Sequence, residues 1–350
     1  MTRLVPLLAL AALAAGSPAG AALGRPGAQA PVCVLLPDTS QPRWERQDRR
    51  YLAAALTAAG VPYSIANAGG SARRQRAQAR KCLAGGAEVL LLAHVDERAG
   101  RSIGRLAGAT GVTVVDYGRL TPGGSASYLV AADDVHAGRL LAEGVVRALD
   151  GRGRRARRPV VARLSGPSAD ASVSLVVRGV AAVLAREVRR DRVARGPAVT
   201  VSSGRPGDVR ALARRLVDRA RGAVDAVVAT DDRLANAVVL VLKEDRRRPI
   251  PLSGRSASLQ GLRNVLAGWQ TGTVYDSPKL LASAAARVAI AVVQGRPVRT
   301  NGRTSDGART VRSVLVRPVW ITRSNYPVLF AEGAYTRSEV CGRGGAGVCP

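Results

Sequence analysis

The sequence predicts an α/β protein built on parallel β-sheets. Short runs rich in Val, Leu and Ile alternate with Ala-, Leu- and Arg-rich segments whose apolar residues recur at helical spacing, as in residues 52–59. Near-continuous apolar strands separated by helices are typical of parallel sheets covered on both faces. The 350 residues suit two such units, at about 150 residues for each.

Nine apolar runs are predicted to be strands. They cover residues 32–37, 63–67, 88–94, 112–117, 128–132, 159–165, 198–203, 224–230 and 271–276. The pattern restarts at Asp133, so these features alone predict two successive layered units.

Residues 1–22 are predicted to be a secretory signal peptide. One Arg precedes an apolar run from Leu4 to Ala15, and small residues follow it. Gly16 and Ser17 stand where a lipid-anchored protein carries Cys. We therefore expect a soluble extracytoplasmic protein without a lipid anchor.

Four cysteines fit an oxidising compartment, in which two disulfides and three connectivities are possible. The pairing of Cys341 with Cys349 is favoured, because the glycine-rich segment between them is flexible. Cys33 would then pair with Cys82. No Cys pair has zinc-ligand spacing and the chain holds two histidines, so no metal site is expected.

The formal charge of +28 raises the question of nucleic acid or another anionic polymer. The arginines are dispersed over most of the predicted helices, which favours scattered surface charge and argues against nucleic-acid binding. Binding to an anionic polymer is kept as a third hypothesis.

Polar residues follow most of the predicted strands, at the sheet edge where ligands bind in open parallel sheets. They lie at Pro37–Arg49, His94–Asp96, Asp116–Arg119, Asp133–Asp134, Ser165–Ser172, Ser202–Asp208, Thr230–Asp232 and Tyr275–Asp276. Carboxylates accept protons from hydroxyl groups, Arg donates in a fork and an aromatic ring covers an apolar face, so this set suits a polyhydroxylated solute.

Each of these residues also has a structural interpretation. Asp133, Asp134 and Asp231 could cap helices. Arg49 could pair with Glu45 four residues earlier, and Trp44 could belong to the core. No nucleophile motif, phosphate-binding loop or dinucleotide fingerprint is recognised, so neither an enzyme nor a cofactor is expected.

The sequence resembles the periplasmic sugar-binding proteins of ABC transporters, in particular the D-xylose-binding type. The stretches that carry the resemblance are LLPDTSQPRWERQDR, VVDYGRLTPGGSASYLVAADD, VDAVVATDDRLANAVVLVLK, LQGLRNVLAGWQTGTVYDSPK and VRSVLVRPVWITRSNYPVLFAEGAYTRSEVC. The resemblance implies two Rossmann-like lobes with parallel sheets, joined by a three-segment hinge. It replaces the two successive units by a lobe of residues 31–131 plus 256–309 and a lobe of residues 132–255 plus 310–350.

The resemblance also implies a set of sugar-binding positions. Arg43 and Trp44 match residues that approach the sugar, with Asp48 and Arg49 behind them. The remaining candidates, matched to motifs or following the predicted strands, are Asp116, Arg119, Asp133, Asp134, Asp170, Asp231, Arg255 and Asp276.

Several of these positions depart from the family pattern. Asp170 is followed by Ala171 and Ser172 where the family has two Asn, Arg255 replaces a Gln, and Asp276 replaces a Lys. The family's second Trp has no counterpart. We therefore expect weak or no binding of xylose, in a pocket retuned for another solute.

The function predicted from the sequence is that of an exported solute-binding component of an ABC-type sugar import system. We expect a monomer that binds a small neutral solute and delivers it to a membrane permease. The alternative is a secreted sensor or interaction protein on the same scaffold that has lost sugar binding.

Overall fold

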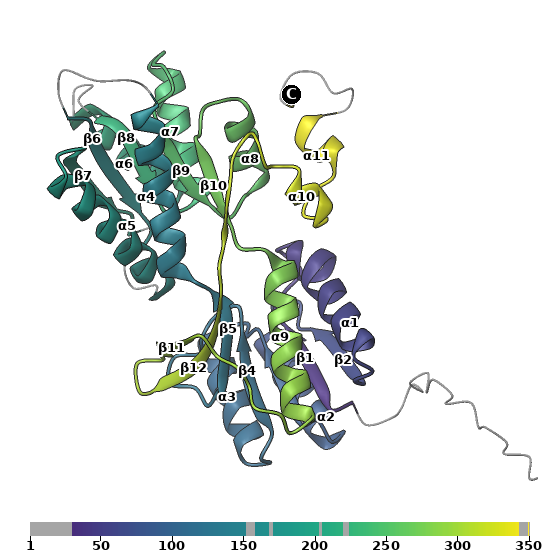
Figure 1. Cartoon of the computed structure of the whole chain (residues 1–350). Helices are drawn as coiled ribbons and strands as arrows, with labels where there is room; N and C mark the ends of the chain where they lie inside the picture. The colour runs from purple at the N-terminus through teal and green to yellow at the C-terminus, as the bar shows by residue number, and fades with distance from the viewer. Residues whose placement is uncertain are drawn as a thin grey trace, which may run out of the picture.

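Two separate β-sheets organise the chain in the computed structural model, which describes residues 30–151, 158–167, 171–202, 205–219, 224–342 and 349 (Figure 1). The expected signal peptide of residues 1–22 and the candidate Asp170 lie outside these residues. Among the described residues, the helices are all too short or too polar to cross a membrane.

The first sheet has the strand order β11-β12-β5-β4-β3-β1-β2 and is parallel except for the β11-β12 pair. Its strands are β1 (Val32–Leu36), β2 (Tyr63–Asn67), β3 (Val89–Leu92), β4 (Thr113–Tyr117), β5 (Tyr128–Ala132), β11 (Gly302–Ser305) and β12 (Thr310–Val316). The helical segments around it are η1 (Trp44–Asp48), α1 (Arg49–Ala58), α2 (Ala72–Ala84), α3 (Glu97–Gly108) and α9 (Pro278–Val293).

The second sheet has the order β13-β10-β9-β8-β6-β7 and is parallel except for the β10-β13 pair. Its strands are β6 (Val160–Ser165), β7 (Ala194–Thr200), β8 (Val224–Ala229), β9 (Leu252–Arg255), β10 (Gly272–Tyr275) and β13 (Val319–Ile321). The helices of this part are α4 (Asp134–Asp150), α5 (Ala171–Arg189), α6 (Pro206–Arg219), α7 (Asp232–Glu244), α8 (Leu259–Leu266), α10 (Val328–Ala331) and α11 (Arg337–Cys341).

Each sheet is covered on both faces, as the apolar strands predict. Apolar side chains of α1 and α9 pack with one face of the first sheet, and those of α2 and α3 pack with the other. In the second sheet α6 and α7 cover one face, and α4 and α5 cover the other. The α/β fold with two lobes is therefore confirmed.

The chain crosses three times between the two lobes, and Figure 1 shows these crossings between the two bodies. The crossings lie between β5 and α4, between β10 and α9, and between β12 and β13. Two boundaries differ from the expected ranges. Residues 272–275 pair with β9 and β13 in the second sheet, and residues 310–316 pair with β5 in the first.

Both disulfides expected from the sequence are present. Cys33 in β1 is bonded to Cys82 in α2, and Cys341 at the end of α11 is bonded to Cys349. The first bond ties β1, the strand next to the sheet edge, to a helix that covers it, and the second joins the end of α11 to Cys349.

Candidate functional site

Arg43, at the end of the loop after β1, is held by the helical segment that follows it. Its Nε and Nη2 atoms each donate to the carboxylate of Asp48 at 2.9 Å, and Asp48 is fully buried. Burial opposes the positive charge, but the Asp48 carboxylate outweighs this and raises the pKa of Arg43. This bidentate pair explains how an arginine is accommodated at the start of a helical segment, where a positive charge is otherwise unfavourable.

Trp44 lies at the junction of the loop and the core of the first lobe. The Arg43 guanidinium stacks over the Trp44 ring at 4.6 Å from the ring centroid. The Trp44 and Tyr117 rings pack edge to face, with their centroids 6.2 Å apart. The Tyr117 hydroxyl donates to Asp48. Trp44 is 5% exposed, yet its buried Nε1 has no hydrogen-bond partner among the described residues. Trp44 is thus both a core side chain and a buried donor with unused capacity.

Three candidate residues come together where the chain crosses between the lobes. Arg255 ends β9, Asp134 begins α4 and Asp276 follows β10. Nη2 of Arg255 donates to Asp134 at 2.6 Å and to Asp276 at 2.8 Å, while Nε donates to Asp276 at 3.0 Å. The second carboxylate oxygen of Asp276, Oδ1, is buried and has no partner among the described residues.

We call these two ion-paired groups, Asp48 with Arg43 and Arg255 with Asp276 and Asp134, the crossing cluster. The charge of Asp276 contributes to the raised pKa of Arg43, which links the first loop to the second crossing. Burial raises the pKa of Asp134, and the Arg255 charge opposes this effect only in part. The cluster spans both lobes and two of the three crossings.

The C-terminal segment closes one side of this region, which sequence reasoning missed. Helices α10 and α11 pack on α8 of the second lobe, while the backbone oxygen of Glu332 accepts from Gln47 and Tyr51 of the first lobe, at 3.3 and 2.7 Å. The Glu332 carboxylate also accepts from Ser277 at 2.6 Å. No sequence pattern joins residues so far apart, so only the folded chain reveals this strap between the lobes.

Three other candidates have the structural roles that the sequence offered as alternatives. Asp133 accepts from the His136 amide at 2.9 Å as the N-cap of α4, and Asp231 accepts from the Leu234 amide at 3.0 Å as the N-cap of α7. Arg49 pairs with Glu45 at 2.6 Å. Among the residues that the structure describes, no hydrogen bond or ion pair joins these three side chains to the crossing cluster.

Asp116 and Arg119 lie on opposite sides of a turn after β4. Asp116 is 1% exposed and accepts from the Thr121 amide and hydroxyl at 2.6 and 3.0 Å, inside the first lobe. Burial raises its pKa to about 7. Arg119 is exposed, and among the described residues no hydrogen bond or ion pair occupies its guanidinium. Of the two, Arg119 is the side chain available to a solute.

Asp232 is a buried acid whose role the sequence did not reveal. Its carboxylate accepts from Gln270, Thr273 and Ser258, and so joins α7 to β10 and to the start of α8. It diverges from its neighbour Asp231, as expected for adjacent residues at a helix start. Within the described ranges, the acidic residues, His and Cys form no group that could hold a metal ion.

Comparisons with known proteins agree with this geometry. Residues 32–297 match a family described as periplasmic binding protein domain. The D-xylose-binding periplasmic protein of Escherichia coli is 22% identical over 311 residues, which cover 88% of this chain and 92% of that protein.

Two solved structures show the same fold. The solute-binding protein of Clostridium phytofermentans with bound β-D-glucose is 21% identical and has a TM-score of 0.71, covering 88% of this chain and 99% of that one. The myo-inositol-binding protein of Caulobacter is 22% identical and has a TM-score of 0.63, covering 89% of this chain and 100% of that one. The resemblance that the sequence motifs suggested is confirmed.

Proposed function

The chain belongs to the family of periplasmic binding proteins, and we propose that it is the exported solute-binding component of an ABC-type importer for a monosaccharide or a related polyol. Proteins of this family are binding components of transport systems and not enzymes. The names of its relatives, which bind D-xylose, glucose or myo-inositol, support this class of solute.

The observation that carries the proposal is the pair of unused polar atoms beside the crossing cluster. Trp44 Nε1 is a buried donor and Asp276 Oδ1 is a buried acceptor, and neither has a partner among the described residues. Buried polar groups are nearly always paired, so unpaired ones require an explanation. A hydroxyl group both donates and accepts, and a polyol presents several of them.

The charges of the crossing cluster favour a neutral solute. Its two guanidinium groups, Arg43 and Arg255, face three carboxylates, those of Asp48, Asp134 and Asp276. The cluster therefore has no surplus positive charge with which to attract a carboxylate or phosphate group. Sugar acids and sugar phosphates are expected to bind less well than neutral sugars.

The lobes are proposed to close on the solute by rotation about the three crossings. On this view the moving units are residues 30–132 with 276–316, and 133–275 with 317–349. The crossing cluster supports this, because Asp276 of one unit is paired with Arg255 of the other. We further propose that the mature protein is a monomer outside the cytoplasm, without a lipid anchor, and that it presents the closed form to a membrane permease.

Calorimetric titration against a panel of neutral sugars and polyols tests the proposal. At least one member should bind, and xylose should bind more weakly than micromolar. Trp44→Phe keeps an aromatic ring but removes the donor, and Asp276→Asn removes the charged acceptor. Each variant is expected to weaken binding about tenfold or more, because a hydrogen bond to a charged group is worth roughly 1.5 to 3 kcal/mol and a buried neutral group left unpaired costs about 1 to 3 kcal/mol.

Matched variants separate a binding effect from a general one. Trp269 stacks against Lys243 and Asp245 pairs with Arg214, both in the second lobe and away from the crossings. Trp269→Phe and Asp245→Asn should therefore bind like the wild type. If no neutral sugar or polyol gives a heat of binding or changes the melting temperature or the radius of gyration of the protein, the proposed function is wrong.

A further inference from the structure

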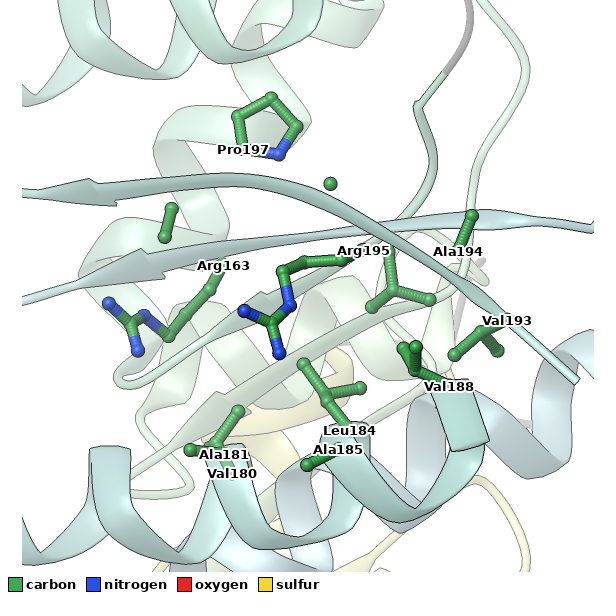
Figure 2. Close-up of a pocket in the computed structure, with 13 residues that line it drawn as sticks. Arg163, Val180, Ala181, Leu184, Ala185, Val188, Val193, Ala194, Arg195 and Pro197 are labelled. Atoms are coloured by element: carbon green, nitrogen blue, oxygen red, sulfur yellow. The ribbon is translucent and has the colours of Figure 1, made fainter. Parts of the chain in front are cut away.

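A cavity lies between α5 and the edge strand β7 of the second lobe, apart from the crossing cluster (Figure 2). Its volume is about 240 Å³, and most of its wall is apolar, with Val180, Leu184 and Val188 contributed by α5. On the strand side, Val161 and Arg163 belong to β6, and residues 194–198 form the start of β7, with Val193 just before it. Because ligands of open parallel sheets bind at the carboxyl ends of the strands, this cavity is distinct from the proposed sugar site.

The packing of α5 accounts for the space. A side chain at Gly179 would overlap the backbone oxygen of Val135, and one at Gly138 would overlap that of Val176, so α4 and α5 meet backbone to backbone. This close approach holds α5 against α4 and away from the edge strand. The pairing of β6 with β7 also shifts register between Val161 and Arg163, which bends the strand over the cavity.

Two guanidinium groups project into this apolar space without counter-ions. Figure 2 shows Arg163 of β6 and Arg195 of β7 lying side by side above Ala181 and Leu184 of α5. Arg163 Nε is buried, and neither arginine has a hydrogen-bond or carboxylate partner among the described residues. Burial lowers the pKa of Arg163.

Arg195 is exposed at the mouth, while Arg163 lies deeper. Two like charges side by side repel each other, an anion between them would offset this repulsion, and arginine forks match the geometry of a carboxylate. The two positive charges and the apolar wall together suit a ligand with one anionic end and one apolar end.

We propose that this cavity binds a small organic carboxylate with an apolar body, aryl or short alkyl. The carboxylate accepts from Arg163 and Arg195, and the apolar body packs against Val180, Leu184 and Val188. Size supports this choice, because an apolar cavity of about 150 Å³ holds a benzene molecule, and the larger space here holds a ring with a short chain. The second lobe would thus carry a ligand independently of the solute between the lobes.

Titration with 3-phenylpropanoate, with 3-phenylpropanol as its neutral partner, tests this proposal on the full mature chain. The acid should bind at least tenfold more tightly than the alcohol, and added salt should weaken the acid alone. Arg163→Met should weaken binding of the acid at least tenfold. Arg178→Met removes the same charge from the exposed face of α5, outside the cavity wall, and should leave binding unchanged.

A second variant keeps both arginines and fills the cavity. Ala181→Leu places a larger side chain under the two guanidinium groups and should abolish binding of the acid, with circular dichroism confirming that the lobe is folded. Equal affinity for acid and alcohol, or wild-type affinity in both Arg163→Met and Ala181→Leu, would overturn the proposal. Sugar binding should be unaffected in every variant, so the two proposals fail separately.

Discussion

Two buried groups of the first lobe, Asp116 and His94, should make opposite contributions to the pH dependence of stability. The Thr121 hydroxyl joins them, at 3.0 Å from Asp116 Oδ1 and 3.1 Å from His94 Nδ1. Burial raises the pKa of Asp116 from 3.8 to about 7. Burial, assisted by the charge of Arg119, lowers the pKa of His94 from 6.5 to about 4.

The signs follow from proton binding in the two states. Between pH 3.8 and 7 folded Asp116 holds a proton that the unfolded chain releases, so stability falls as pH rises. Between pH 4 and 6.5 the unfolded chain protonates His94 and the folded chain does not, so stability rises with pH. Each group changes the free energy of unfolding by about 1.4 kcal/mol per pH unit within its range, and the two changes cancel where the ranges overlap.

Removing one of the two groups should leave the pH dependence of unfolding that the other group causes. In Asp116→Asn only His94 titrates, so the free energy of unfolding should increase by about 2 kcal/mol from pH 4.5 to pH 6, relative to the wild type. In His94→Asn only Asp116 titrates, and the free energy should decrease by about the same amount. Urea unfolding followed by circular dichroism at the two pH values measures both differences.

Subtracting the wild-type value removes the contributions of all other groups. If the effect of Asp116→Asn is the same at pH 4.5 and at pH 6, Asp116 is ionised throughout and the reasoning from burial is wrong. If Asp116 instead contacts a sugar, Asp116→Asn should alter the affinity for that sugar and leave the pH dependence of the free energy of unfolding unchanged.

The structure makes two further predictions about stability, both measurable by urea unfolding. Arg255→Met leaves two partly buried carboxylates without their cation and should cost about 2 to 4 kcal/mol, whereas Arg214→Met, in an exposed pair, should have little effect. Equal midpoints for these two variants would contradict the crossing cluster. Gly138→Ala forces α4 from α5 and should cost at least about 2 kcal/mol, whereas Gly108→Ala meets nothing within 4 Å and should be neutral or slightly stabilising. If the two alanine variants are equally stable, the helices do not meet at Gly138.

The strands that could be predicted are those whose side chains fill the core. All nine expected runs contain strands; most are buried and continuously apolar, while β2 and β7 lie at sheet edges and are only partly buried. Strand β9 was missed, since its sequence LSGR is small and polar. The reason is structural: the Asp232 carboxylate occupies the space that a side chain at Gly254 would need. The start of β7 was missed because Gly196 and Pro197 are tolerated there only on an edge strand.

The boundaries of the lobes depend on strand pairing between distant parts of the chain. Nothing in the local pattern of residues 310–316 shows that they pair with β5, about 180 residues earlier, and not with the second sheet. The candidate site shows the same limit. The motifs identified Arg255, Asp134 and Asp276 as candidates, but their ion pairs join residues up to 121 positions apart. Residue types are visible in a sequence, while their partners are not.

The departures from the family pattern gain a common explanation from the crossing cluster. Replacing a Gln by Arg255 and a Lys by Asp276 would each leave an unbalanced charge near the hinge, but together the two replacements form an ion pair, which Asp134 extends. The two replacements are thus bonded to each other in this chain. Nε and Nη2 of Arg255 are occupied, while among the described residues Trp44 Nε1 and Asp276 Oδ1 are buried and have no partner.

Because Arg255 and Asp276 belong to different units of the proposed hinge motion, rotation of the lobes would alter the ion pair between them, whereas Arg255 and Asp134 move together. If a solute binds at Asp276 Oδ1 as proposed, its binding and the angle between the lobes are coupled through one carboxylate, whose other oxygen accepts from Arg255. A solute that draws Asp276 towards itself changes the geometry of that pair, and a solute without a hydroxyl at this position does not. Selectivity among neutral solutes would therefore arise as much from closure as from contact.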